Sequence, residues 1–508
     1  MSFFKKAAEK LKDAQSEAVD KFNQLKISHS SNNDSCSSNG PPPIPPRPTH
    51  RRDPNTTGAK NNQGKFIIRN PNTGNLEVEG TGEVIKFASL CAPELFDNEG
   101  FEKEDTMRTI SQFGIWPVTR TYTLKVKSCR INRGHINGWD CERNDFMYDE
   151  DMFKSIDYTI AMAAKYNVRL IIPIINQDFG SEETNWVGNF SDLIRHRHGL
   201  KDWHEAQQMN WWEHPDCIDS MKKIVTFLLN RGYAIEMGVT ETSDLFRGIK
   251  SLAPRTLIMD GSFARTDAIQ YSYEKKVLES DLVDIISWHY YGYGEKRRVR
   301  DDVEAARNHK KAFICGEYGF FAHGHEFENF LKHCSDHGVA GTLAWSLRPH
   351  SAKGGFKTHG EGNGIWSYHA PGWKPYQNGQ DDPEWDHREK DVIGAIRKAA
   401  FKLTGDKPPK IELDAPYVFL VDEGQSFSWR GTAWADHYEV WCNTSGGAED
   451  GWTLCQGGVT DNVKEGRLKY PSQVIYDQIG MQGAQISLRM RGMTSEKQPG
   501  PFSNVINI

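Results

Sequence analysis

The sequence predicts an α/β fold: a (β/α)₈ barrel followed by a small all-β sandwich, with a disordered proline-rich region ahead of both. Three observations lead to this prediction. From about Phe66 onward, apolar strand-like runs alternate with helical patterns, as in chains built from βα units. Eight such units fit into roughly 300 residues, the usual size of a closed barrel. After Gly405 the helical pattern gives way to alternating segments separated by turns, which are typical of a sandwich.

Composition narrows the class of protein. The chain has 508 residues, too many for one ordinary domain, and 37% of them are hydrophobic. A net charge of −6 argues against a nucleic-acid partner. No run approaches the roughly 20 apolar residues of a membrane span, and no apolar signal core follows the first lysines. The nine cysteines lack zinc-like spacing, so we expect reduced thiols and a cytoplasmic or non-classically exported protein.

The region ahead of the barrel divides into two parts. Residues 1–28 carry apolar side chains at helical spacing among many Lys and Glu, which predicts an amphipathic helix. Such a helix either docks loosely on the body of the protein or makes weak contact with a membrane surface or a partner, and the pattern leaves both open. Residues 29–63 form a Ser/Asn- and Pro-rich linker that we expect to be disordered.

A proline motif lies within this linker. Pro42, Pro45 and Arg47 fit the P-x-x-P-x-R pattern that binds SH3 domains as a polyproline helix. Proline-rich linkers also match this pattern by chance. The motif therefore indicates an SH3-domain partner without establishing one.

The barrel is expected over residues 64–405. Helical spacing of apolar residues predicts barrel helices at 150–166 and at 326–337, the second ending at Gly338. Apolar runs predict the eight strands at 84–90, 118–122, 169–175, 233–238, 256–260, 285–289, 312–317 and 341–346.

The sandwich is expected over residues 406–508. Its strands are predicted around 417–421, 437–441 and 485–491, and no helical period is evident in this region. The closing stretch, from Arg491-Gly-Met to Pro501-Phe-Ser-Asn504, resembles the last strands of fibronectin type III modules.

Polar and aromatic side chains stand at the C-terminal ends of several predicted barrel strands. These ends meet at one face of a barrel, the face where barrel enzymes carry their chemistry. Glu317 ends the seventh strand in an apolar run through Gly316, and the neighbouring strand ends supply Arg or His to keep it ionised and an aromatic face for a sugar. Each alone has a structural explanation, but together they predict one site: Glu317 with Arg120, His289, Tyr291 and Trp345.

These strand ends resemble glycoside hydrolase family 5, in particular its fungal endo-β-mannanase and cellulase-like members. The resemblance implies Glu317 as the nucleophile of a retaining, two-carboxylate hydrolysis of a β-linked carbohydrate, with the other four residues binding substrate and with no cofactor or metal. It is carried by Phe87-Ala-Ser-Leu90, Val118-Thr-Arg-Thr-Tyr122, Leu170-Ile-Ile-Pro-Ile-Ile175, Ser287-Trp-His-Tyr-Tyr291, Gly316-Glu-Tyr-Gly319 and Ala344-Trp-Ser346.

The fourth strand departs from the family pattern. The family places its acid/base glutamate there in an Asn-Glu pair, whereas this chain has Val239 and Thr240 at those places. Glu241 comes one position later, on the other face of a regular strand unless a bulge turns it inward. With such a bulge, Glu241 would lie in the barrel mouth, and we expect it to be the acid/base of an active glycosidase. The alternative is a catalytically impaired barrel that serves as a carbohydrate-binding or scaffold protein.

Overall fold

The computed structural model describes residues 65–175, 187–209, 211, 214–231, 247, 249–251, 253–261, 273–362, 365–373, 388–445, 450–481 and 485–508. Several predictions lie outside these residues: the N-terminal helix, the linker with its SH3 motif, the fourth barrel strand and Glu241. Among the described residues, no helix combines the length and the apolar character needed to cross a membrane.

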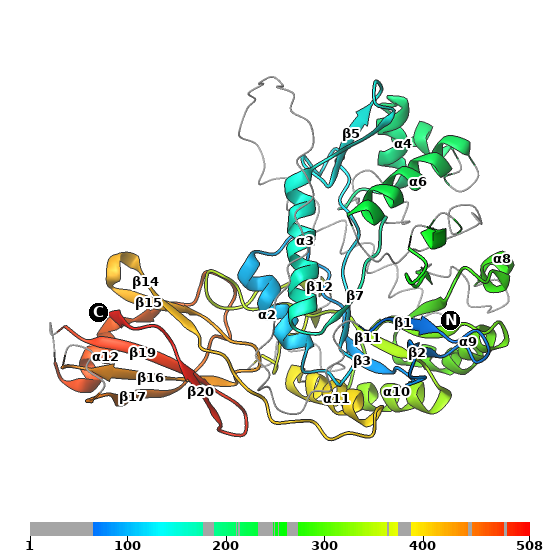
Figure 1. Cartoon of the computed structure of the whole chain (residues 1–508). Helices are drawn as coiled ribbons and strands as arrows, with labels where there is room; N and C mark the ends of the chain where they lie inside the picture. The colour runs from blue at the N-terminus through cyan, green and yellow to red at the C-terminus, as the bar shows by residue number, and fades with distance from the viewer. Residues whose placement is uncertain are drawn as a thin grey trace.

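The chain folds into a (β/α)₈ barrel followed by an all-β sandwich (Figure 1). Barrel strands β3 (Phe87–Leu90), β11 (Gly341–Ala344), β10 (Ala312–Gly319), β9 (Ile285–Tyr291) and β8 (Met259–Asp260) form one parallel sheet in that order. Strands β4 (Val118–Arg120) and β7 (Arg169–Ile171) form a second parallel pair. The hydroxyl of Thr119 in β4 donates to the carbonyl of Leu90 in β3 over 2.8 Å, which places the pair next to the larger sheet.

These strands follow the predicted order, with different ends. Strands β3, β4, β7, β8 and β11 are shorter than expected; Val84, for example, is exposed and lies ahead of β3. Strands β9 and β10 instead run two residues further, to Tyr291 and Gly319. Of the predicted site residues, Tyr291 lies in this added length, at the end of β9.

The helices around the barrel begin and end at recognisable signals. The Asp149 side chain caps the first turn of α3 by accepting from the Met152 amide, and Gly338 ends α10 in the left-handed conformation. Both predicted helices are confirmed. The helices of this part are α2 (Gly100–Ile110), α3 (Glu150–Lys165), α4 (Phe190–His198), α5 (Trp203–Gln207), α6 (Pro215–Asn230), α8 (Lys275–Glu279), α9 (Val299–Asn308), α10 (Gly324–His337) and α11 (Glu389–Lys402).

Two short hairpins complete the barrel. Strands β5 (Ile136–Asp140) and β6 (Asp145–Tyr148) form an antiparallel hairpin between β4 and α3. Strands β1 (Ile67–Arg69) and β2 (Leu76–Val78) cover the N-terminal end of the barrel, where Arg69 forms an ion pair with Asp284 at 3.1 Å. The interior below the site is filled by Phe87, Val118, Ile285, Ile314 and Leu343 together with Leu76 and Val78 of this hairpin.

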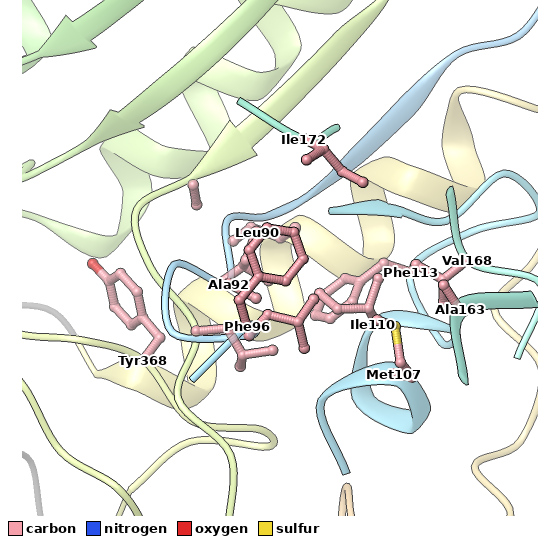
Figure 2. Packing of buried hydrophobic residues seen from close by; sticks show 14 of the residues in the cluster. Leu90, Ala92, Phe96, Met107, Ile110, Phe113, Ala163, Val168, Ile172 and Tyr368 are labelled. Carbon is pink, nitrogen blue, oxygen red and sulfur yellow. The ribbon is translucent and has the colours of Figure 1, made fainter. Parts of the chain in front are cut away.

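A larger apolar core lies between the barrel strands and their outer helices. Figure 2 shows part of it, including Leu90 of β3, Ile110 of α2 and Phe113, which belong to the same cluster of buried side chains. The same contiguous cluster continues into the C-terminal sandwich, where it includes Phe427, Trp429 and Val440. The two parts therefore share one core rather than meeting only at a tether.

The sandwich consists of two antiparallel sheets. One has the order β14–β15–β18, and the other has the order β17–β16–β19–β20, with β21 also paired to β19. The strands are β14 (Tyr417–Val421), β15 (Ser426–Arg430), β16 (His437–Asn443), β17 (Thr453–Val459), β18 (Tyr470–Pro471), β19 (Ser487–Met493), β20 (Pro499–Phe502) and β21 (Ile506–Asn507).

Two expectations for this region are wrong. A helix, α12 (Ser472–Ile479), lies where no helical period was evident; it is only eight residues long and is stopped by Gly480 in the left-handed conformation. Reduced thiols were expected throughout, yet Cys442 of β16 and Cys455 of β17 are bonded to each other. Sequence spacing did not reveal this pair, because the two strands bring it together only on folding.

Candidate active site

A β-bulge in β10 decides where the Glu317 side chain points. Phe313 and Cys315 face the outer helices, so a regular strand would also turn Glu317 outward. The register with β9 pairs Cys315 with Trp288 and then Glu317 with His289, which leaves Gly316 unopposed. This extra residue rotates Glu317 into the barrel mouth. A side chain at Gly316 would come within 3.0 Å of the His289 ring, so glycine suits the bulge.

Three predicted residues meet the Glu317 carboxylate. Arg120 at the end of β4 donates from Nη1 to Oε1 over 2.5 Å. The Tyr291 hydroxyl at the end of β9 donates to Oε2, and the His289 Nδ1 atom lies 3.3 Å from the same oxygen. Both carboxylate oxygens are thereby engaged, and Glu317 is only 9% exposed. The predicted convergence of these strand ends is seen in the structure.

The surroundings keep Glu317 ionised. Burial alone would raise its pKa, but the charge of the Arg120 guanidinium and the hydrogen bonds from Arg120 and the Tyr291 hydroxyl hold the pKa below its usual value. Burial also lowers the pKa of His289 to about 4, against the opposing effect of Glu317. His289 is therefore neutral at pH 7, and the permanent positive charge beside Glu317 is that of Arg120. The sequence argument had given both residues the charged role.

Trp345 follows β11 and is half-buried. Its backbone amide donates to the carbonyl of Tyr318 over 2.9 Å, and the peptide bond after it is cis. Its ring meets the Tyr122 ring in a T-shaped arrangement, with 6.2 Å between ring centroids. Trp345 also packs against the barrel interior, so it combines a structural contact with a partly open aromatic surface.

The sequence argument did not single out several residues around this site. Phe320 stacks on Tyr291 with ring centroids 4.9 Å apart, and Tyr122 faces Trp345. Glu361 of β12 (Gly360–Gly362) accepts from Ser367 at 2.7 Å and from Ser346, the residue after Trp345, at 3.4 Å. Tyr122 is the last residue of one strand-end motif and Phe320 directly follows another, which is a usable signal. Glu361 belongs to a long connection and carries no such signal.

The second carboxyl group of a retaining mechanism is not placed. Glu241 and the expected fourth strand lie outside the described residues, so the distance from Glu241 to Glu317 is not defined. Within the described ranges, His, Cys, Asp and Glu side chains nowhere gather in threes with a geometry that would hold a metal ion. The described site therefore offers one oriented, ionised carboxylate with a neutral imidazole, a phenol and a guanidinium around it.

Comparison with known sequences gives one short match. No protein-family model matches the chain. A protein of Oryza sativa subsp. japonica, "Putative mannan endo-1,4-beta-mannosidase 5", is 35% identical over 57 residues. This match spans 11% of the chain and 12% of the rice protein.

Comparison with solved structures gives matches of low identity. An endo-1,4-β-mannanase from Rhizomucor miehei is 17% identical, with a TM-score of 0.45 over 56% of this chain and 90% of its own. The endo-β-1,4-mannanase from Thermotoga petrophila is 14% identical, with a TM-score of 0.44 over 84% of this chain and 98% of its own. A glycoside hydrolase family 5 mannosidase from Rhizomucor miehei is 13% identical, with a TM-score of 0.47 over 67% of this chain and 97% of its own.

Proposed function

We propose that this chain is a glycoside hydrolase that cleaves a β-linked polysaccharide or oligosaccharide, in the manner of a mannan endo-1,4-β-mannosidase. The observation that carries the proposal is the Glu317 carboxylate, buried at the barrel mouth, held by Arg120 and Tyr291 and kept ionised at neutral pH. An oriented anion with low pKa suits a nucleophile at an anomeric carbon. The short match to the rice protein named for mannan endo-1,4-β-mannosidase supports the substrate class.

The proposed reaction has two steps. Glu317 attacks the anomeric carbon and forms a glycosyl ester while the glycosidic oxygen leaves with a proton from an acid. Water then attacks the ester, giving its proton to the conjugate base of that acid and releasing the sugar and Glu317. Arg120 and Tyr291 fix the carboxylate oxygens for attack. Trp345 and Tyr122 offer aromatic surface to the pyranose.

Glu241 is the proposed acid/base residue. Its carboxyl group would have to lie about 5–5.5 Å from that of Glu317 in a retaining enzyme. Because Val239 and Thr240 occupy the places of the family's Asn-Glu pair, a catalytically impaired barrel that binds carbohydrate is the second candidate function. The two candidates differ in how they handle poor leaving groups, since an activated aryl oxygen departs without a proton.

The deciding experiment measures turnover of mannan, β-glucan and activated aryl β-glycosides by the unmodified chain. An active enzyme cleaves polysaccharide and loses this activity in the Glu241→Gln variant. In that variant an activated aryl glycoside should still form the Glu317 ester, because its leaving group needs no proton. An impaired barrel releases aryl groups only, its ester hydrolyses slowly, and azide accelerates that release. Val239→Asn combined with Thr240→Glu should then restore polysaccharide cleavage. No turnover of any glycoside would contradict the hydrolase proposal.

The remaining parts of the proposal concern the flanking regions. The pairing of a three-stranded with a five-stranded antiparallel sheet supports a fibronectin type III-like module. For the N-terminal region we propose an SH3 partner through Pro42, Pro45 and Arg47 and weak membrane-surface contact of residues 1–28. For the protein as a whole we propose a cytoplasmic or non-classically exported location. A pull-down with an SH3-domain panel, using Arg47→Ala as control, tests the first of these.

A further inference from the structure

The connection after barrel strand β11 begins at the barrel mouth, contacts the sandwich and returns to the barrel. We call residues 345–361 the strand-eight segment. At its start, the Leu347 amide donates to the Cys91 carbonyl at the end of β3 over 2.8 Å. The return is tied to this start, because Tyr368 donates to the Ser346 carbonyl and Arg348 donates to the Tyr368 carbonyl. These hydrogen bonds connect the returning chain to the residues beside Trp345.

The outer part of the segment is bound to the sandwich by backbone hydrogen bonds. Phe356 donates to Val463 over 2.9 Å, and its own carbonyl accepts from Glu465 over 2.8 Å. Gly354 approaches the sandwich so closely that a Cβ atom there would lie 2.3 Å from the Ser428 hydroxyl oxygen. Its φ of +84° also lies in the left-handed region, so a side chain is excluded by two independent constraints.

A buried ion cluster joins the segment to helix α2 and to the sandwich. His350 is 1% exposed, with Nδ1 3.0 Å from Asp105 of α2 and Nε2 3.2 Å from Asp461 of the sandwich. The Tyr438 hydroxyl of β16 donates to Asp461 over 2.6 Å. Burial disfavours the charged imidazole, but Asp105 and Asp461 outweigh it and raise the pKa of His350 to about 10. The proposed hydrolysis does not use this charge.

We propose that the C-terminal sandwich is a positioning element of the candidate active site, which holds the strand-eight segment, and through it Trp345, by way of His350 between Asp105 and Asp461. This inference rests on the proposed function for its catalytic consequence, although the contact itself does not. His350, Asp461 and Tyr438 are then positioning residues for substrate binding. A module that merely captured carbohydrate at a distance would not need a buried ionic contact with this connection.

The test uses the full-length chain. Asp461→Asn removes the charge on the sandwich side while keeping the shape, and Tyr438→Phe removes only the hydroxyl that donates to Asp461. The matched control is Glu439→Gln, which alters the next residue of β16, where Glu439 pairs with Arg491 on the face opposite Tyr438. If Asp461→Asn does not fold, Tyr438→Phe carries the test.

The first measurement is amide hydrogen exchange at Leu347, Arg348 and Tyr368. We expect exchange at these three amides to quicken on the order of tenfold in Asp461→Asn, less in Tyr438→Phe, and not in Glu439→Gln, while Ile286 in β9 stays unchanged. Equal exchange in Asp461→Asn and Glu439→Gln would show that the His350 contact does not hold the strand-eight segment. This outcome does not depend on whether the chain hydrolyses glycosides.

The second measurement is steady-state kinetics on a soluble mannooligosaccharide. We expect the KM of Asp461→Asn to rise about tenfold while kcat stays within about twofold, because Glu317 itself is not moved. Faster exchange with unchanged KM would overturn the positioning role. If the unmodified chain does not turn over this substrate, calorimetric affinity replaces KM; the proposed function itself fails only if no glycoside is hydrolysed. No affinity in that case would overturn the positioning role as well.

Discussion

His289 and His350 both lie buried beside carboxylates, yet at neutral pH His289 is neutral and His350 is protonated. His350 is the more buried of the two, at 1% against 9% exposure, and it is the charged one. The difference lies in the neighbours. Two aspartates face His350 and raise its pKa, whereas Glu317 beside His289 is already paired with Arg120, so burial prevails and lowers the pKa of His289.

This contrast separates a contact that holds structure from one that prepares chemistry. The cluster of Asp105, His350 and Asp461 has its charges largely satisfied by one another, which suits a fixed junction. At Glu317 one guanidinium fixes the anion, and the neutral His289 adds orientation without a second positive charge. A carboxylate stabilised in this moderate way remains able to react.

The largest effect is expected for Glu317→Gln, which tests the catalytic half of this comparison. The change is nearly isosteric and removes the nucleophilic oxygen, so we expect aryl-glycoside turnover to fall on the order of 10⁴-fold or more. Circular dichroism should be unchanged. The control is Glu304→Gln, which alters an exposed carboxylate on α9. Near-normal turnover of the Glu317 variant would show that another group is the nucleophile.

The other half of the comparison is tested by His350→Gln. Removing the cation leaves Asp105 and Asp461 buried without their partner, and we expect the free energy of unfolding to fall by about 3–5 kcal/mol at pH 7. Because the folded pKa is raised to about 10, the stabilisation is complete below the unfolded pKa and is lost as the pH rises through the folded value.

The pH dependence of that difference is the sharper measurement. Urea unfolding of both proteins should show the stability gap narrowing from about pH 6.5 to about pH 10. Lysines with lowered pKa, such as Lys103 at about 8, titrate in both proteins and cancel in the comparison. A gap that stays constant over this window would mean that His350 is neutral in the folded protein.

Two variants then compare the residues around Glu317. Arg120→Met removes the permanent charge, so the pKa of Glu317 should rise and the acid limb of kcat/KM should move up by about one pH unit or more. His289→Gln removes a ring that is neutral at pH 7, and it should shift the limb less, while still lowering kcat. If the larger shift came from His289→Gln, His289 would be the charged partner.

The sequence was sufficient for the order of the barrel units and for the meeting of Arg120, His289, Tyr291 and Glu317. Both follow from hydrophobic periodicity and from the common edge of parallel strand ends. It was not sufficient for the bulge at Gly316, because register depends on the neighbouring strand. The contact between Asp105 and His350 spans 245 positions, and no local pattern encodes such a pairing.

The smallest expected effect is that of Trp345→Ala, and it tests whether this residue belongs to the site or to the core. The ring is half-buried, packs against the barrel interior and faces Tyr122, so some loss of stability is expected. If the open face stacks on a sugar, the Kd for a soluble mannooligosaccharide should rise roughly tenfold, while Trp345→Phe keeps much of the affinity. Calorimetry beside a thermal melt separates the two roles. A large drop in Tm with unchanged affinity would place Trp345 in the core, and the strand-eight segment would then have to influence KM through Tyr122 or Glu361 instead.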